Sequence, residues 1–263
     1  MNGFKLGLVV AKLIDIHAHL QFPQFDGDRD EVIKRTEEAG IGVINVGTDI
    51  KTSEAAVKLA EKHNKMWATV GLHPSDWQIG FEYNFYKKLA THPKVVAIGE
   101  CGLDYFRVRG EDEKVGQREI FGQQIQLALE VKKPLMIHCR DAYADVVAVL
   151  KSFSGVIGNV HFFTSDWLTA KKFLDLGFSL SFSGVITFVR DYDEVVRNVP
   201  LEMIFVETDC PFAAPVPYRG QRNEPRYLVE VLRQVATLRG VAEETVGAAV
   251  LNNVRRLFQL PLA

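Results

Sequence analysis

Short apolar segments alternate with longer amphipathic segments along the whole chain. The apolar segments are rich in Val and Ile and are bounded by Gly, Pro, Asn or Asp, which is typical of buried β-strands. The segments between them carry apolar residues at helical spacing, as at Val32, Ile33, Thr36 and Ala39. This alternation predicts a parallel sheet whose strands are joined by crossover helices. Eight strands are expected, at residues 13–19, 42–48, 66–73, 95–102, 134–140, 155–163, 178–186 and 203–209.

Two helical segments are expected after the eighth strand. Asn223, Glu224 and Pro225 are typical of a helix start, with Asn as the cap and Pro in the first turn, and Gly240 marks the end of that helix. The amphipathic pattern of residues 246–257 then predicts an additional C-terminal helix on the outside of the sheet.

Eight strand–helix units in 263 residues match the size of one (β/α)8 barrel, the TIM-barrel architecture. We therefore expect a single domain over residues 1–263, with residues 1–12 as an N-terminal extension that leads into the first strand. A doubly wound open sheet is the alternative, because periodicity does not show whether the eighth strand pairs with the first. Neither a GxGxxG motif nor a P-loop follows a predicted strand, which counts against that alternative.

Composition narrows the setting in which the protein works. The formal net charge is -2, so no overall positive field attracts a nucleic acid, and any polyanion site must be local. The three cysteines are odd in number and form no CxxC pair, which argues against a disulfide framework and favours a reducing cytoplasm. No apolar stretch approaches the roughly 20 residues that span a bilayer, so no membrane association is expected.

Polar residues stand at the ends of the predicted strands. Asp15, His17 and His19 alternate with apolar residues at the end of the first strand, so their side chains share one face. The carboxyl ends of barrel strands meet on the face where barrel enzymes build their sites. Four further strands end in a carboxylate or an imidazole, at Glu100, His138, His161 and Asp209.

A single histidine or carboxylate at a strand end is usually a structural residue. Four imidazoles and two carboxylates converging on one face instead indicate a metal centre, because Zn prefers such nitrogen and oxygen donors and Mn or Co tolerates them. Alternation places Arg140 on the face of His138 and Glu207 on the face of Asp209, and it turns the following cysteines toward the helices. The cysteines, which are expected to be small core residues, are Cys101, Cys139 and Cys210. Two further histidines, His63 and His92, are expected at the surface.

Six short motifs occur in a fixed order along the chain. They are DIHAHL at residues 15–20, GLHP at 71–74, AIGECGLDY at 97–105, HCRDA at 138–142, ETDCP at 207–211 and RNEP at 222–225. In order and spacing they resemble the TatD family of metal-dependent hydrolases, which are amidohydrolase-type TIM barrels. The resemblance covers nearly the whole chain, and the GExGLD and ETDxP blocks are its most specific parts.

The resemblance implies two divalent cations, Zn, Mg or Mn. One would be held by His17, His19, Glu100 and Asp209, and the other by His138, His161 and the bridging Glu100. One departure is visible after the sixth strand, where the family usually has His-Cys-Phe-Ser/Thr-Gly and this chain has HFFTSD at residues 161–166. The missing glycine is expected to reshape the loop over the substrate.

Two cations about 3.5–4 Å apart would lower the pKa of a shared water, supply a bridging hydroxide at neutral pH and hold an oxygen of the scissile group. Glu100 and Asp209 are the expected catalytic residues, with Asp209 as the proton acceptor. The resemblance suggests phosphodiester hydrolysis on DNA, as exonuclease-like trimming of a single strand or an end.

Arginines after four of the strands are consistent with such a substrate, because their planar donors bind phosphate oxygens in pairs. His73, Arg140 and Arg222 are the expected substrate contacts. Two other functions stay open: the same centre could hydrolyse an ester, lactone or amide, including a D-aminoacyl ester on tRNA, or the protein could be a metal-stabilised binding protein without turnover. The arginines that follow these four predicted strands are Arg107, Arg109, Arg140, Arg190, Arg219 and Arg222.

Overall fold

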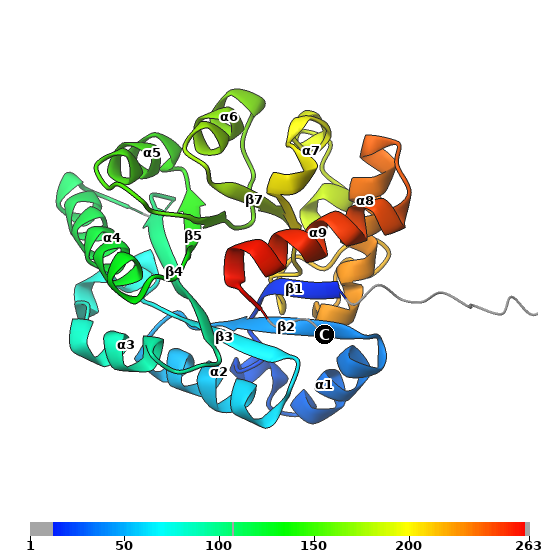
Figure 1. Ribbon diagram of the computed structural model, residues 1–263, viewed down its shortest axis with the longest axis horizontal. Coiled ribbons are helices and arrows are strands. Elements are labelled where there is room, and N and C mark those ends of the chain that lie inside the picture. Colours follow the sequence, from blue (N-terminus) through cyan, green and yellow to red (C-terminus); the bar gives the residue numbers. More distant parts are fainter. Residues whose placement is uncertain (1–12, 107, 261–263) are drawn as a thin grey trace, which may run out of the picture.

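The strands of this protein form one parallel sheet in sequence order, β1 to β8 (Figure 1). The computed structural model describes residues 13–106 and 108–260, so the expected N-terminal extension, residues 1–12, lies outside the described residues. The strands are β1 (Leu13–Ala18), β2 (Ile41–Val46), β3 (Met66–Val70), β4 (Val95–Asp104), β5 (Leu135–Arg140), β6 (Gly158–Val160), β7 (Ser179–Phe182) and β8 (Ile204–Val206).

The sheet closes on itself between β1 and β8. Ala18 forms a parallel bridge with Cys210, and the amide of His19 donates to the carbonyl of Cys210 at 2.9 Å. On the same seam, the amide of Asp209 donates to the carbonyl of His17 at 2.9 Å. The (β/α)8 barrel is therefore confirmed over the open sheet, and the closing contacts bring residues from the two ends of the chain together.

Helices surround the barrel (Figure 1). They are α1 (Arg29–Glu38), α2 (Ile50–Lys62), α3 (Tyr83–Ala90), α4 (Glu111–Val131), α5 (Tyr143–Lys151), α6 (Trp167–Asp175), α7 (Asp193–Asn198), α8 (Leu228–Arg239) and α9 (Glu243–Phe258). Helix α9 packs against α8 and against strands β1 and β8, which confirms the additional C-terminal helix.

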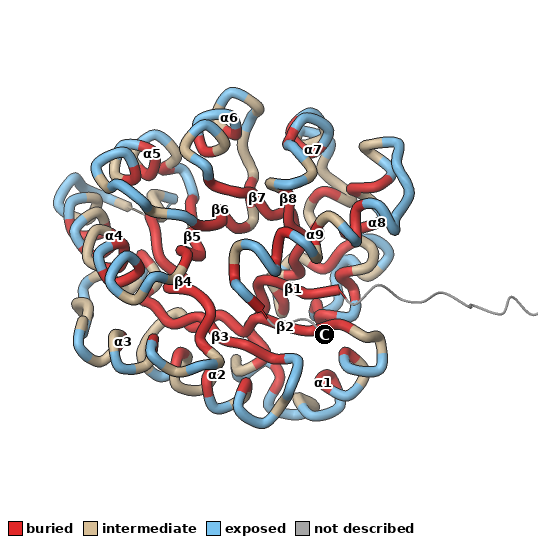
Figure 2. Tube along the Cα trace, in the orientation of Figure 1, coloured by how far each residue is buried: buried red, intermediate tan, exposed pale blue. Residues whose placement is uncertain are grey.

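The core lies inside the barrel and between the strands and the helices. Figure 2 shows the strands almost wholly buried, while the helices expose their outer faces. The three cysteines are buried in this core, as alternation predicted: Cys101, Cys139 and Cys210. Among the described residues, no helix combines the length and apolar character needed to cross a membrane.

The start of α8 differs from the prediction. A 3₁₀ turn, Pro225–Tyr227, comes first, and the helix follows it. Asn223 caps neither element, because their N-cap residues are Glu224 and Tyr227. Its side-chain amide donates instead to the carbonyls of Thr208 and Phe212 at 2.8 and 2.7 Å. The predicted role of Asn223 was therefore wrong: its side chain holds the loop after β8. The other end is as predicted, with Gly240 in the left-handed conformation at φ 65°.

Candidate metal centre

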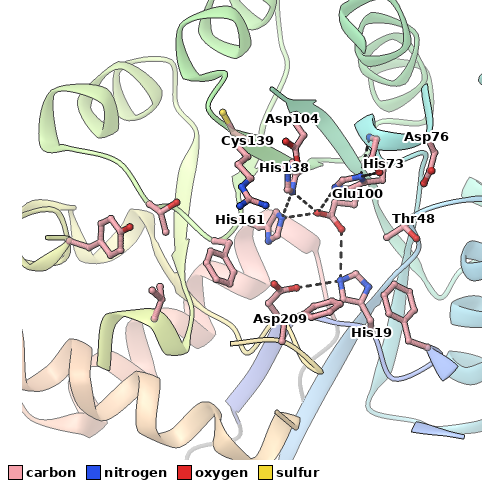
Figure 3. Close-up of a pocket in the computed structure, with 18 residues that line it drawn as sticks. His19, Thr48, His73, Asp76, Glu100, Asp104, His138, Cys139, His161 and Asp209 are labelled. Carbon is pink, nitrogen blue, oxygen red and sulfur yellow. Dashed lines mark hydrogen bonds and ion pairs between the residues drawn. The ribbon is translucent and has the colours of Figure 1, made fainter. Parts of the chain in front are cut away.

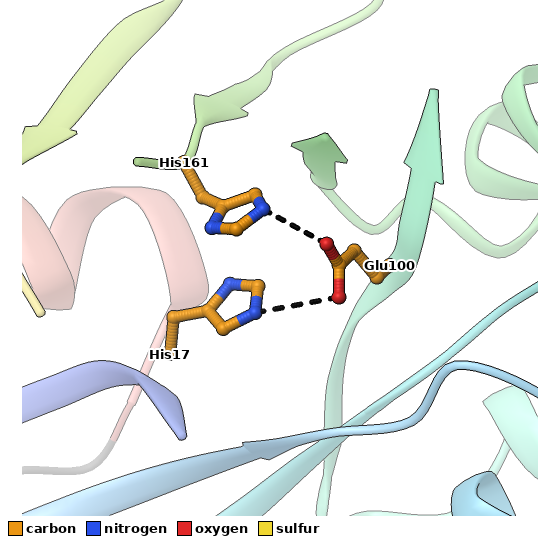
Figure 4. A group of neighbouring side chains, drawn as sticks. All are labelled: His17, Glu100 and His161. Atoms are coloured by element: carbon orange, nitrogen blue, oxygen red, sulfur yellow. Dashed lines mark hydrogen bonds and ion pairs between the residues drawn. The ribbon is translucent and has the colours of Figure 1, made fainter. Parts of the chain in front are cut away.

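Six polar side chains converge at the carboxyl ends of the barrel strands. They come from β1 and the residue after it, from β4, from β5, and from the loops that follow β6 and β8. Figure 3 shows most of them around one carboxylate, and Figure 4 shows two histidines facing its two oxygens. The six are His17, His19, Glu100, His138, His161 and Asp209.

Glu100 stands at the centre of this cluster and is 4% exposed. Its Oε1 lies 2.9 Å from Nδ1 of His138 and 2.9 Å from Nε2 of His161. Its Oε2 faces the other way, 3.5 Å from Nε2 of His17 and 3.8 Å from Nε2 of His19. One carboxylate therefore faces two separate pairs of imidazoles, one with each oxygen.

Asp209 completes the half of the cluster built on β1. Its Oδ1 lies 3.7 Å from Nε2 of His17 and 3.3 Å from Nε2 of His19, and these two nitrogens are themselves 3.2 Å apart. Asp209 has a φ of 53°, which is strained for a residue with a side chain. The hydrogen bond from its backbone amide to the carbonyl of His17 holds it in this conformation. The seam of the barrel thus fixes the carboxylate beside the two imidazoles.

Groups behind the imidazoles set which ring nitrogen faces the cluster. Nε2 of His138 lies 3.0 Å from Oδ2 of Asp104, so it donates there and leaves the Nδ1 lone pair for the cluster. Nδ1 of His19 donates to a backbone carbonyl, that of Val46, at 2.8 Å. Nδ1 of His161 lies 3.4 Å from Oε1 of Glu207. Such partners orient histidines that ligate metals.

Burial of these groups shifts their proton equilibria. Burial and the neighbouring His161 lower the pKa of His17 to about 4. Burial acts in the same direction on His161, but its contacts with Glu100 and Glu207 outweigh it and raise the pKa of His161 well above its usual value. The imidazoles of His161 and His73 overcome the burial of Glu100 and hold its pKa well below the ordinary range. Glu100 is therefore an ionised carboxylate that requires positive partners.

The donor set fits divalent cations. Three groups of three ligand atoms within 4.8 Å of one another draw on these residues and their neighbours. They are His17, Glu100 and His161; His17, His19 and Asp209; and His73, Asp104 and His138. The Nε2 atoms of His17 and His19 point toward each other and toward carboxylate oxygens. Such a mixed set of nitrogen and oxygen donors is the coordination that Zn or Mn takes.

A cavity of about 630 Å³ opens above this cluster. His73 lines it, with Nε2 at 3.6 Å from Oε1 of Glu100 and Nδ1 accepting a bond from the amide of Ser75. Arg140 also lines it, and its guanidinium lies 3.6 Å above the ring of Phe106. Two of the three expected substrate contacts therefore stand at the pocket.

The other arginines among the described residues do not line the pocket. Arg222 binds both carboxylate oxygens of Asp28 at 2.7 and 2.6 Å, which ties the loop after β8 to the start of α1. Arg219 stacks on Phe188 at 3.6 Å, and Arg107 lies outside the described residues. Among the described arginines, Arg140 is the one that lines the cavity.

Two glutamines of α4 hold the backbone beside the site, a role that the sequence pattern does not predict. Gln117 accepts from the amide of Asp104 at 2.8 Å and donates to its carbonyl at 2.9 Å. Gln124 makes the same pair of bonds with Leu72, both at 2.9 Å. Helix α4 therefore fixes the segments that carry Asp104 and His73. The signal in the sequence is a seven-residue spacing, which places both side chains on one helix face.

A barrel with imidazoles and carboxylates gathered at the carboxyl ends of its strands has the arrangement of a metal-dependent hydrolase. Residues 14–259 match the family model described as TatD related DNase. The chain therefore belongs to the TatD family of metal-dependent hydrolases.

Individual relatives cover almost the whole chain. It is 40% identical over 255 residues to the "uncharacterized metal-dependent hydrolase YabD" of Bacillus subtilis, which covers 94% of this chain and 99% of that protein. It is 36% identical over 263 residues to the "3'-5' ssDNA/RNA exonuclease TatD" of Erwinia billingiae, covering 95% and 100%. The crystal structure of YJJV, a TatD homologue from Escherichia coli, superimposes with a TM-score of 0.88 at 29% identity, covering 96% and 100%.

Proposed function

We propose that this protein is a two-metal deoxyribonuclease that hydrolyses phosphodiester bonds at an end of single-stranded DNA. The position of Glu100 carries the proposal, because each of its carboxylate oxygens faces a separate pair of imidazoles. A carboxylate in this position suits a bridge between two cations. The name of the Erwinia billingiae relative, a 3'-5' ssDNA/RNA exonuclease, supports the substrate.

In this proposal the six residues divide into two sets that share one member. His17, His19 and Asp209 would hold the first cation with Glu100, and His138 and His161 would hold the second with Glu100. The bonds from His138 to Asp104 and from His19 to Val46 direct the ring lone pairs toward the cations.

Bound divalent cations would lower the pKa of a water and withdraw charge from the phosphate oxygens. Asp209 would act as the general base, because its side chain lies beside His17 and His19, lines the pocket and is 14% exposed. The same carboxyl group would return the proton to the leaving oxygen. Its strained backbone and seam contact keep it in position for both transfers.

The pocket supplies positive and hydrogen-bonding groups for the phosphate. The guanidinium of Arg140 stands at the wall, and stacking on Phe106 holds its plane. His73 directs Nε2 toward the cluster, since Nδ1 is engaged by Ser75. A cavity of about 630 Å³ has the size of a small-molecule site, which suits the terminal part of one strand rather than a duplex.

The test uses metal-free protein reconstituted separately with Mg, Mn or Zn. Single-stranded DNA labelled at either the 5′ or the 3′ end is compared with a panel of small esters and lactones. We expect metal-dependent release of nucleotides from one end and little turnover of the panel. Glu100→Gln, which removes the central negative charge, should abolish the cleavage. Failure to cleave DNA with every metal would overturn the proposal, and turnover of an ester or lactone in its place would assign the centre to that chemistry.

A further inference from the structure

The pocket above the metal centre has two walls of different chemistry. One wall follows β2, β3 and β4 and is polar, with Thr48, His73, Ser75, Asp76 and Asp104. Figure 3 shows Thr48, His73 and Asp76 on one side of Glu100, with His161 and Asp209 on the other. The opposite wall follows β6, β7 and β8 and presents mainly apolar groups, including Phe162, Val185, Tyr192 and Phe212.

Phe162 is held in the apolar wall by its backbone. It follows the candidate ligand His161 directly and has a φ of 48°, in the left-handed region that a residue with a side chain rarely adopts. Its amide donates to Oε1 of Glu207 at 2.7 Å, which fixes this conformation. The ring lines the pocket and is partly exposed. This is the position where the chain departs from the cysteine of the family pattern.

Phe212 extends the apolar wall on the other side of the cluster. It is 47% exposed, although its amide is bonded to the carbonyl of Asp209 at 2.9 Å. Its ring meets that of Phe22 edge-on, with centroids 6.5 Å apart, and Phe22 stacks on the ring of His19 at 4.4 Å. Aromatic surface therefore runs from the metal centre to the rim. Large exposed apolar groups at a pocket are typical of a binding surface.

We propose that this wall binds a nucleobase of the nucleotide next to the scissile bond, by stacking and apolar contact with Phe162 and Phe212. The inference rests on the proposed nuclease function. The polar wall opposite then faces the sugar and phosphate, close to Arg140 and His73. Stacking uses the flat face that every base has, so the enzyme requires a base without selecting its identity. The bound strand is thereby oriented across the metal centre.

The experiment compares two single-stranded oligonucleotides that differ only at the nucleotide to be removed. One carries a base there, and the other carries an abasic tetrahydrofuran residue. Stacking of a base on aromatic side chains is worth roughly five- to 150-fold in affinity, so the wild-type protein should prefer the base-bearing strand in kcat/KM by about fivefold or more. All four bases should be removed at similar rates.

Phe162→Ala and Phe212→Ala should each lower kcat/KM for the base-bearing strand by a larger factor than for the abasic strand. Phe162→Tyr, which keeps the ring, should retain the preference and so separates ring contact from the loop conformation. Leu168→Ala is the matched control, because this residue is 72% exposed and lies on α6 outside the pocket.

The two proposals fail in different ways. A wild-type protein that cleaves both strands equally would overturn the stacking wall and leave the nuclease function standing. A wild-type protein that cleaves neither strand with any metal would overturn both. Equal losses on both strands in Phe162→Ala and Phe212→Ala would also count against the wall, since truncation would then act on the metal centre rather than on the base.

Discussion

The bond between Asp104 and His138 gives the most specific prediction about the metal centre. Nε2 of His138 donates to Oδ2 of Asp104 at 3.0 Å, and the carboxylate side chain is 17% exposed. Without this acceptor the ring loses its fixed tautomer, and its proton can move to Nδ1, the atom that faces Glu100. Partners of this kind contribute 10- to 100-fold to metal affinity, or about 1.4–2.7 kcal/mol.

Asp104→Ala should therefore weaken the cation held by His138 and His161 by about 10- to 100-fold and leave the other cation in place. Titration of metal-free protein against a chelating indicator measures the two affinities. Asp104→Asn keeps an oxygen acceptor and should fall between the wild type and the alanine variant. Asp76→Ala is the matched control, because Asp76 brings the same charge to the same pocket. Wild-type affinity for both cations in Asp104→Ala would refute the orienting role of this carboxylate.

Four further predictions address the rest of the site. Asp209→Asn should keep the circular dichroism spectrum but lower kcat by about 100- to 10,000-fold, and near-normal turnover would remove Asp209 as the general base. Gln124→Met leaves the amide and carbonyl of Leu72 without partners, so urea denaturation should show a free energy of unfolding lower by about 1–3 kcal/mol. Gln126→Met, on the exposed face of α4, should leave that free energy unchanged. EDTA should lower the melting temperature without changing the secondary structure at 25 °C, because cations bind the native state and the barrel core is independent of them. Loss of activity with no change in melting temperature would argue against bound structural cations. Arg140→Gln should reduce DNA cleavage and weaken its dependence on salt, and an unchanged salt profile would exclude a phosphate contact.

The sequence predicts the barrel because each strand is a short apolar run between turn-forming residues. It locates strand ends less well, since β6 spans Gly158–Val160 against an expected 155–163. His161 and Asp209 therefore lie on loops rather than on strands. Alternation does not set their directions, which depend on backbone hydrogen bonds to neighbouring strands, such as that from the amide of His161 to the carbonyl of Ile137 on β5 at 2.9 Å.

Long-range partners explain what the pattern missed. Alternation placed Glu207 on the face of Asp209, but the pattern does not name the partners of its carboxylate, which are the amide of Phe162 and the hydroxyl of Ser181. Gln124 falls in the buried stripe of α4 by its spacing, but its bonds join residues 52 positions apart in the chain. Asn223 resembles a helix cap locally and instead bonds a neighbouring loop. None of these contacts is encoded in local periodicity.

In the proposed hydrolytic centre one carboxylate, that of Glu100, would join two cations. The most direct measurement adds Mn to metal-free protein in fractions of an equivalent while following both bound metal and cleavage of end-labelled single-stranded DNA. We predict that the protein binds two equivalents, that cleavage rises with the second, and that Glu100→Gln shows neither. Full cleavage after a single equivalent, or a wild-type protein that binds only one, would contradict the account.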